Sequence, residues 1–164
     1  MTKQLAIIWF SRTGGSKAMA QAAYDAACDE PECDVRLIEA GKAGPEDLLA
    51  SQAYMFVFPE NLAAIAGGMK EFFDRSYYDL LGKIEGRAYA AMICAGSDGE
   101  NAQRQVERIA TGWRLKKVAE TLIVCTHAQS REAILAPKTI AEADLAKCRE
   151  MGATLAAGLV MGVF

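Results

Sequence analysis

Histidine is almost absent from this chain, since His127 is the only one in 164 residues. Five cysteines are present, but none belongs to a C-x-x-C pair. Without such pairs or further histidines, no zinc site can be assembled from sequence neighbours, and we expect no metal. Scattered thiols in odd number suit a reducing, cytoplasmic compartment, where each is expected to pack as a small apolar group.

No block of like charge stands out either. Lysine and arginine number 18 and aspartate and glutamate 21, and the two signs are interleaved along the chain. The only doubled basic pair is Lys116-Lys117, so no basic stripe indicates a nucleic-acid partner. The length and the ordinary composition, 52% hydrophobic and 24% charged, fit a single globular domain over residues 1–164.

Long hydrophobic runs are missing as well. Residues 1–10 contain one lysine and a short apolar run, but no small-residue cleavage site of a signal peptide. The uncharged stretch 152–164 falls short of the roughly 18 apolar residues that a membrane span needs. We therefore expect no membrane contact, and predict that this stretch ends a packed helix or forms a subunit contact.

What the chain does have is a regular alternation of apolar runs and helical patterns. Strands are predicted at 5–10, 34–38, 54–58, 87–94 and 120–125. Helices are predicted at 17–28, around 69–80, from Ser97, and from Thr139 toward Leu159, the last two on capping-box spacing. This order predicts a doubly wound α/β sheet, in which ligands bind at the carboxyl ends of the strands.

The turn after the first strand has the composition of an anion site. Ser11, Thr13 and Ser16 offer hydroxyls, Gly14-Gly15 lets backbone amides approach closely, and a helix N-terminus follows. The alternative is a tight turn in which Ser16 is an ordinary N-cap. The position directly after a buried strand favours the anion site.

Several other phosphate sites can be excluded. A P-loop needs glycine where Phe10 stands, and a dinucleotide fingerprint needs a third glycine. A small tyrosine phosphatase needs C-x5-R, but Glu100 stands at the arginine position after Cys94. A response regulator needs an aspartate after the third strand, where this chain has Pro59-Glu60.

The remaining pattern, Ser11-x-Thr13-Gly14-x-Ser16, resembles the T/S-x-T-G-x-T/S phosphate loop of the flavodoxin-like flavoproteins. Residues 59–75 are similar to the second loop and following helix of that family, and 94–99 fall at its third loop. The resemblance covers nearly the whole chain and is strongest to members that reduce quinones or related acceptors with NAD(P)H. It implies a three-layer αβα sandwich with a five-stranded parallel sheet in the order 2-1-3-4-5, and FMN as the cofactor.

The resemblance also implies which residues bind FMN, the first loop holding its phosphate and the other two its ring. They are Ser11, Arg12, Thr13, Gly14, Gly15, Ser16, Pro59, Glu60, Asn61, Leu62, Ala95, Gly96, Ser97, Asp98 and Gly99. Arg12 either neutralises phosphate charge or points into solvent, and Glu60 either follows the flavin or is an exposed loop carboxylate. Asn61 suits a positive φ. No residue is assigned a catalytic role.

The second and third loops contain no aromatic residue, unlike those of electron-carrying flavodoxins, which stack aromatic rings on the flavin. An uncovered ring admits a nicotinamide or a flat acceptor for hydride transfer. The leading hypothesis is therefore an FMN-dependent NAD(P)H oxidoreductase that passes electrons to a quinone or another small-molecule acceptor. A one-electron carrier for a protein partner and an FMN-binding module without turnover stay open as alternatives.

Side chains elsewhere leave further alternatives. Trp113 is expected in the core, although it is also a candidate to cover the ring. Tyr77 and Tyr78 are candidates for a pocket wall or a dimer contact, and His127 for a proton donor. Because so short a chain supplies one wall of a pocket, a homo-oligomer with a shared active site is among the expectations.

Overall fold

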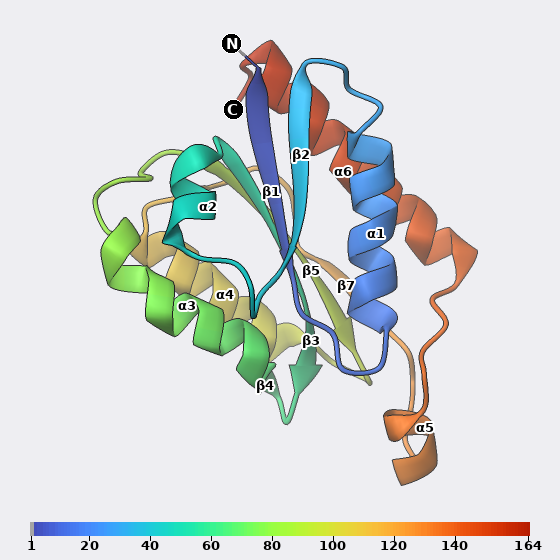
Figure 1. Cartoon of the computed structure of the whole chain (residues 1–164). Helices are drawn as coiled ribbons and strands as arrows, with labels where there is room; N and C mark the ends of the chain where they lie inside the picture. Colours follow the sequence, from blue (N-terminus) through green and yellow to red (C-terminus); the bar gives the residue numbers. More distant parts are fainter. Residues whose placement is uncertain (1) are drawn as a thin grey trace.

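The computed structural model describes residues 2–164 and shows a three-layer α/β sandwich (Figure 1). A twisted sheet lies in the middle, with α1 (Gly15–Ala27) and α6 (Glu142–Met161) on one face. The other face is covered by α2 (Pro45–Ala50), α3 (Gly67–Leu80) and α4 (Glu100–Gly112). None of the helices in this part of the chain is long and apolar enough to span a membrane.

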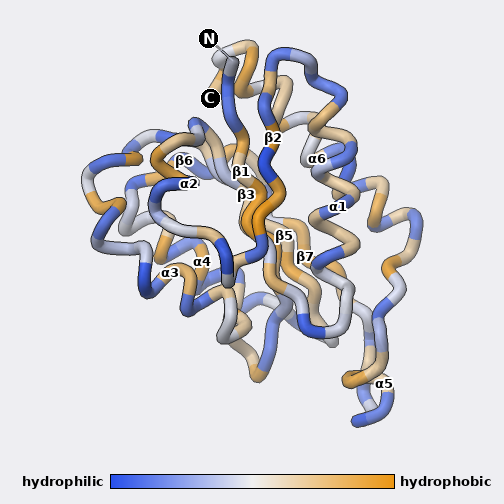
Figure 2. The backbone as a smooth tube through the Cα atoms, viewed as in Figure 1, coloured by the Kyte–Doolittle hydropathy of each residue, from blue (hydrophilic) through white to orange (hydrophobic). Residues whose placement is uncertain are grey.

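Four parallel strands form the body of the sheet in the order β2-β1-β3-β5. They are β1 (Lys3–Trp9), β2 (Cys33–Glu39), β3 (Ala53–Asn61) and β5 (Ala88–Ala95). All eight residues of β5 are buried, as expected for a strand covered on both faces. Figure 2 shows this hydrophobic band running through the centre of the molecule.

The prediction of five strands in the order 2-1-3-4-5 is wrong, because the sheet formed by the described residues has seven strands, five of which follow the order β2-β1-β3-β5-β6. Two short strands, both parallel to β5, form the edge: β7 (Leu122–Cys125), which lies within the predicted strand 120–125, and β6 (Lys116–Lys117), which was not predicted. The seventh strand, β4 (Ala64–Ile65), pairs antiparallel with the end of β3. The parallel, doubly wound arrangement itself is confirmed.

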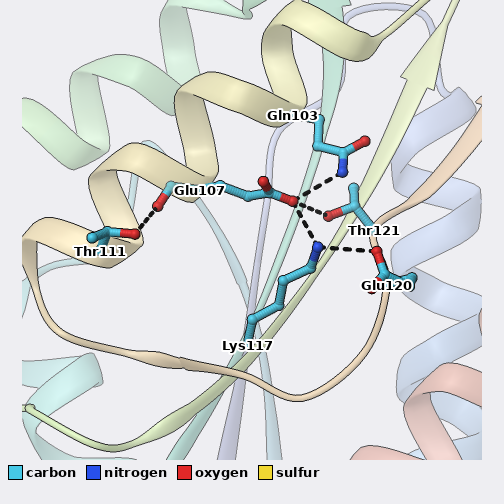
Figure 3. Close-up of polar contacts among 6 residues, drawn as sticks. All are labelled: Gln103, Glu107, Thr111, Lys117, Glu120 and Thr121. Carbon is cyan, nitrogen blue, oxygen red and sulfur yellow. Dashed lines mark hydrogen bonds and ion pairs between the residues drawn. The ribbon is translucent and has the colours of Figure 1, made fainter.

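A polar network from α4 holds the two edge strands (Figure 3). The Glu107 carboxylate accepts hydrogen bonds from Gln103 at 2.9 Å, from Lys117 at 2.8 Å and from Thr121 at 3.5 Å. Lys117 also donates to Glu120 at 3.1 Å. The chain therefore leaves the sheet after β6 and returns at β7 while both pieces stay tied to one helix.

Two helix starts differ from the capping-box prediction. The N-cap of α4 is Gly99, with φ of 92°, and that of α6 is Ala141; neither makes a side-chain capping bond. The helices α2 and α5 (Arg131–Leu135) were not predicted, because five or six residues are too few for a periodic pattern.

Trp113 is fully buried, as expected for a core residue. Its Nε1 donates to the Tyr77 carbonyl at 3.0 Å, and the two rings stack with centroids 5.6 Å apart. Tyr78 is 81% exposed near the end of α3. These three aromatic residues therefore belong to the α3–α4 side of the molecule rather than to the carboxyl edge of the sheet.

Candidate functional site

A cavity of about 470 Å³ opens at the carboxyl edge of the sheet. It is formed by the loops after β1, β3 and β5, with a contribution from α5, and its size is within the usual range for a cofactor pocket. A smaller hollow, which shares many of these residues, adds Ala95, Thr126 and Lys138 to the lining. Another hollow, of about 380 Å³, lies between α6 and the two edge strands, away from these loops.

The first loop is built as a cradle at the N-terminus of α1. Gly14 is the N-cap and has φ of 97°, a conformation that favours glycine. The Ser11 hydroxyl accepts a hydrogen bond from the Gly14 amide at 3.0 Å and so holds the turn closed. The amides of the first turn of α1 have no acceptor within the helix, which leaves them available to an anion.

Ser16 is the second residue of α1 and not its N-cap, so the capping role considered for Ser16 is wrong. Its hydroxyl oxygen is buried and has no hydrogen-bond partner in the described part of the chain, and the whole residue is only 1% exposed. Buried hydroxyls normally find a partner. Ser16 lines the cavity, so its unused hydrogen-bonding capacity lies at the site.

Beneath this cradle the loop packs closely on β5. A Cβ added to Gly15 would lie 2.7 Å from the Cys94 sulfur, so no larger residue fits without a shift. Burial raises the pKa of the Cys94 thiol to about 11. Cys94 is therefore a neutral thiol at pH 7 that forms the floor of the site.

The second loop places two polar side chains in the cavity. One carboxylate oxygen of Glu60 accepts from the Gly99 amide at 3.0 Å, and the other is buried with no partner in the described part of the chain. The Asn61 side-chain oxygen is likewise buried without one. Glu60 is thus no exposed loop carboxylate, and it joins the second loop to the third.

The turn that ends β3 has positive φ at Leu62 and Ala63, at 52° and 58°, and not at Asn61, although asparagine tolerates that conformation. Two side chains of α4 hold this turn. Asn101 donates to the Ala63 carbonyl, and the Gln105 side chain accepts from the Ile65 amide at 2.8 Å. A two-residue turn with both φ values positive usually contains glycine, so these contacts stabilise a strained backbone.

The third loop lies opposite. Gly96 and Ser97 line the cavity, and Ala95 lines the adjoining smaller hollow. Asp98 accepts from the Glu100 amide at 3.0 Å and so forms a turn into α4. Ser97 is exposed and does not cap the helix, contrary to its predicted second role.

The structure brings most of the expected residues around one cavity; the exceptions are Ala95, which lines only the adjoining smaller hollow, and Gly14, Asp98 and Gly99, which line neither. Arg12 lines the cavity, is exposed, and makes no ion pair among residues 2–164. Sequence reasoning missed lining residues that come from β5 and from the segment after β7, namely Cys94, Thr126, Ala128, Ile134, Leu135 and Lys138. The carboxyl ends of parallel strands share one edge of the sheet, and this applies equally to the fifth predicted strand, 120–125. The loop that follows it could therefore have been included in the predicted site.

No lining residue of the cavity is aromatic. Tyr77, Tyr78 and Trp113 do not reach it, and His127 is exposed and not among its lining residues. The geometry therefore does not support Trp113 as a residue that covers a flavin ring. Nor does it support Tyr77 and Tyr78 as a wall of this cavity.

Comparison with known proteins now defines the fold. No protein-family model matches the chain. A flavodoxin from Aquifex aeolicus (strain VF5) is 32% identical over 93 residues, which is 57% of this chain and 50% of that protein, so the match spans only half of the relative's length. A solved flavodoxin from the domain Archaea superposes with a TM-score of 0.76 over 96% of this chain and 99% of its own, at 17% identity. The fold is flavodoxin-like.

The same fold occurs inside larger proteins. Rubredoxin oxygen:oxidoreductase from the anaerobe Desulfovibrio gigas superposes with a TM-score of 0.77 over 99% of this chain, at 17% identity. The match covers only 37% of that oxidoreductase. A flavodoxin-like fold is therefore found both as a separate protein and as part of an oxidoreductase.

Proposed function

We propose that this chain is an FMN-binding flavoprotein that transfers electrons through the flavin. The observation that carries the proposal is the Ser16 hydroxyl, buried without a partner in the cradle at the start of α1. An unsatisfied buried polar group costs about 1–3 kcal/mol, which a ligand oxygen at this position would recover. A phosphate group has the acceptor oxygens that this hydroxyl and the free amides of the first turn require.

The residues present fit an FMN phosphate without a metal. Ser11, Thr13 and Ser16 supply hydroxyls, and the helix N-terminus supplies a partial positive charge. Arg12, exposed at the same cavity and free of ion pairs among the described residues, is positioned to neutralise part of the dianion. This corresponds to phosphate binding by amides, hydroxyls and one guanidinium.

The second loop fits the polar end of the flavin ring. The unpartnered oxygens of Glu60 and Asn61 are acceptors for the ring N–H, and the bond from Gly99 fixes Glu60 in place. A carboxylate held beside the ring disfavours a negatively charged reduced flavin, which makes reduction harder. Bound FMN would supply the redox chemistry, while these residues orient it and tune its potential.

For the direction of electron flow, we favour NAD(P)H as the donor and a quinone or another small molecule as the acceptor. The absence of aromatic side chains from the lining supports this, because a nicotinamide needs close, aligned contact with the ring. A one-electron carrier for a protein partner is the second candidate, and the similarity to the Aquifex aeolicus flavodoxin favours it.

Binding is tested first, by titrating the wild-type protein and a Thr13→Ala/Ser16→Ala variant with FMN and with riboflavin. We expect saturable FMN binding to the wild type, with large loss in the variant, and a smaller effect on riboflavin, which lacks the phosphate. If the wild-type protein shows no saturable FMN binding, the proposed function is wrong.

The electron donor is tested by anaerobic mixing of the FMN-loaded protein with NADH or NADPH. Rapid loss of the oxidised flavin absorbance supports the reductase. No bleaching, together with two separated one-electron potentials in a chemical reduction, supports the carrier.

A further inference from the structure

The segment between β7 and α6, residues 126–141, contributes to the lining of the cavity and of the adjoining hollow, and is tied at both ends to the loops of the site. At its start, the Thr126 amide donates to the Ala95 carbonyl at 2.9 Å and the His127 amide to the Gly96 carbonyl at 2.8 Å. At its end, the Lys138 amide donates to the Thr13 carbonyl at 2.8 Å. The segment therefore bridges the third loop and the phosphate cradle.

Packing and internal hydrogen bonds hold this bridge in shape. A Cβ added to Gly15 would lie 3.4 Å from both Ile140 and Lys138, so the end of the segment lies directly on the cradle. The Lys138 ammonium donates to the Ile134 carbonyl at 2.8 Å and to the Ala136 carbonyl at 2.6 Å, which closes the C-terminal end of α5. Ser130 caps its other end.

Within this anchored segment, two large aliphatic side chains have no core to pack into. No residue of α5 is buried, and Ile134 and Leu135 are 51% and 62% exposed. Figures 1 and 2 show α5 standing off the carboxyl edge with a hydrophobic stretch at one end. A single exposed aliphatic residue means little, but both of these line the cavity formed by the three loops.

We propose that Ile134 and Leu135 are FMN-binding residues, whose side chains pack against one face of the flavin ring. This inference rests on the proposed function. The ring is a large flat apolar surface, and the second and third loops offer it no aromatic partner. Contact between the two aliphatic side chains and the ring removes apolar surface of the side chains and of the ring from water, which favours binding. Because a planar ring has two faces, this wall leaves the opposite face accessible to an acceptor or a donor.

The test compares the wild-type protein with an Ile134→Ser/Leu135→Ser variant. We measure its affinity for FMN, for riboflavin and, by competition, for inorganic phosphate. Loss of the aliphatic contacts is expected to weaken FMN and riboflavin by the same factor, about tenfold to hundredfold. The affinity for inorganic phosphate is expected to stay at the wild-type value, since the cradle is intact.

Two control variants separate contact with the ring from other effects of substitution. Ala133→Ser alters the same short helix without removing a large side chain, and Leu81→Ser removes an aliphatic residue, 46% exposed, outside the cavity. Both should bind FMN as the wild type does. Circular dichroism should show the same fold in every variant, because the replaced residues are exposed.

Wild-type FMN affinity in the double variant would overturn the inference, and so would a loss of phosphate affinity equal to that of FMN, which would assign the segment to the cradle instead. These outcomes differ from failure of the proposed function, in which the unaltered protein already binds no FMN.

Discussion

Ser16→Ala should stabilise the FMN-free protein and weaken FMN binding, two effects of opposite sign from one hydroxyl. In the absence of ligand, the Ser16 oxygen is buried with no partner among the described residues. Its removal relieves a desolvation penalty of about 1–3 kcal/mol. For a domain of about 150–250 residues each kcal/mol corresponds to roughly 2–4 °C in Tm, so we expect a rise of about 2–12 °C.

In the proposed FMN complex, the same hydroxyl would donate to a charged phosphate oxygen. A hydrogen bond to a charged group contributes about 1.5–3 kcal/mol, so its loss should raise the Kd for FMN about 10- to 150-fold. Thermal unfolding monitored by circular dichroism, with and without FMN, measures both effects. The variant should begin from a higher Tm and gain less from added FMN.

Ser76→Ala is the matched control. The Ser76 hydroxyl is also buried without a partner in the described chain, but it lies on α3 and lines no part of the cavity. This variant should be as stable as the wild type or more stable, with unchanged affinity for FMN. The reasoning is refuted if Ser16→Ala lowers the Tm of the FMN-free protein and binds FMN as tightly as the wild type.

Three further predictions concern packing, charge and thiols. Gly68→Ala should cost about 1–3 kcal/mol and weaken FMN binding, since its Cβ would lie 2.2 Å from the Phe10 ring ahead of the cradle; Gly67→Ala, with nothing within 4 Å, should be neutral or stabilising in the same denaturant titration. Burial alone would raise the pKa of Glu107, but hydrogen bonds from Lys117 and Gln103 lower it overall. The ionised Glu107 carboxylate therefore contributes fully to the free energy of unfolding above the usual pKa of 4.5, and this contribution is lost as the pH falls through the lowered pKa. The difference in free energy of unfolding between the wild type and Glu107→Gln, measured by denaturant titration, should therefore disappear in acid. A thiol reagent at pH 7 should label Cys28 first, and mass spectrometry should find three cysteines labelled only after unfolding, namely Cys33, Cys94 and Cys148. Equal labelling of all five would contradict this burial.

The sequence alone was sufficient for the features that depend on local pattern. The runs that became β1, β3 and β5 are continuous and apolar, so burial on both faces could be predicted from their composition. Because the carboxyl ends of parallel strands share one edge, the order of the strands was enough to predict that the three loops lie together. The burial of Trp113 was predicted from the apolar face of α4 in the same way.

Tertiary contacts decided the features that no local pattern contains. The gap between β6 and β7 depends on Glu107 of α4, and the turn at Leu62 and Ala63 depends on two other side chains of that helix. The capping boxes failed because glycine at positive φ begins α4 with no side-chain bond. The role of α5 was invisible in the sequence, since a five-residue helix has no period and its position comes from hydrogen bonds to loops more than 30 residues away. Such long-range pairings are chosen by the packed molecule as a whole, because each becomes favourable only after the others have brought its two partners together.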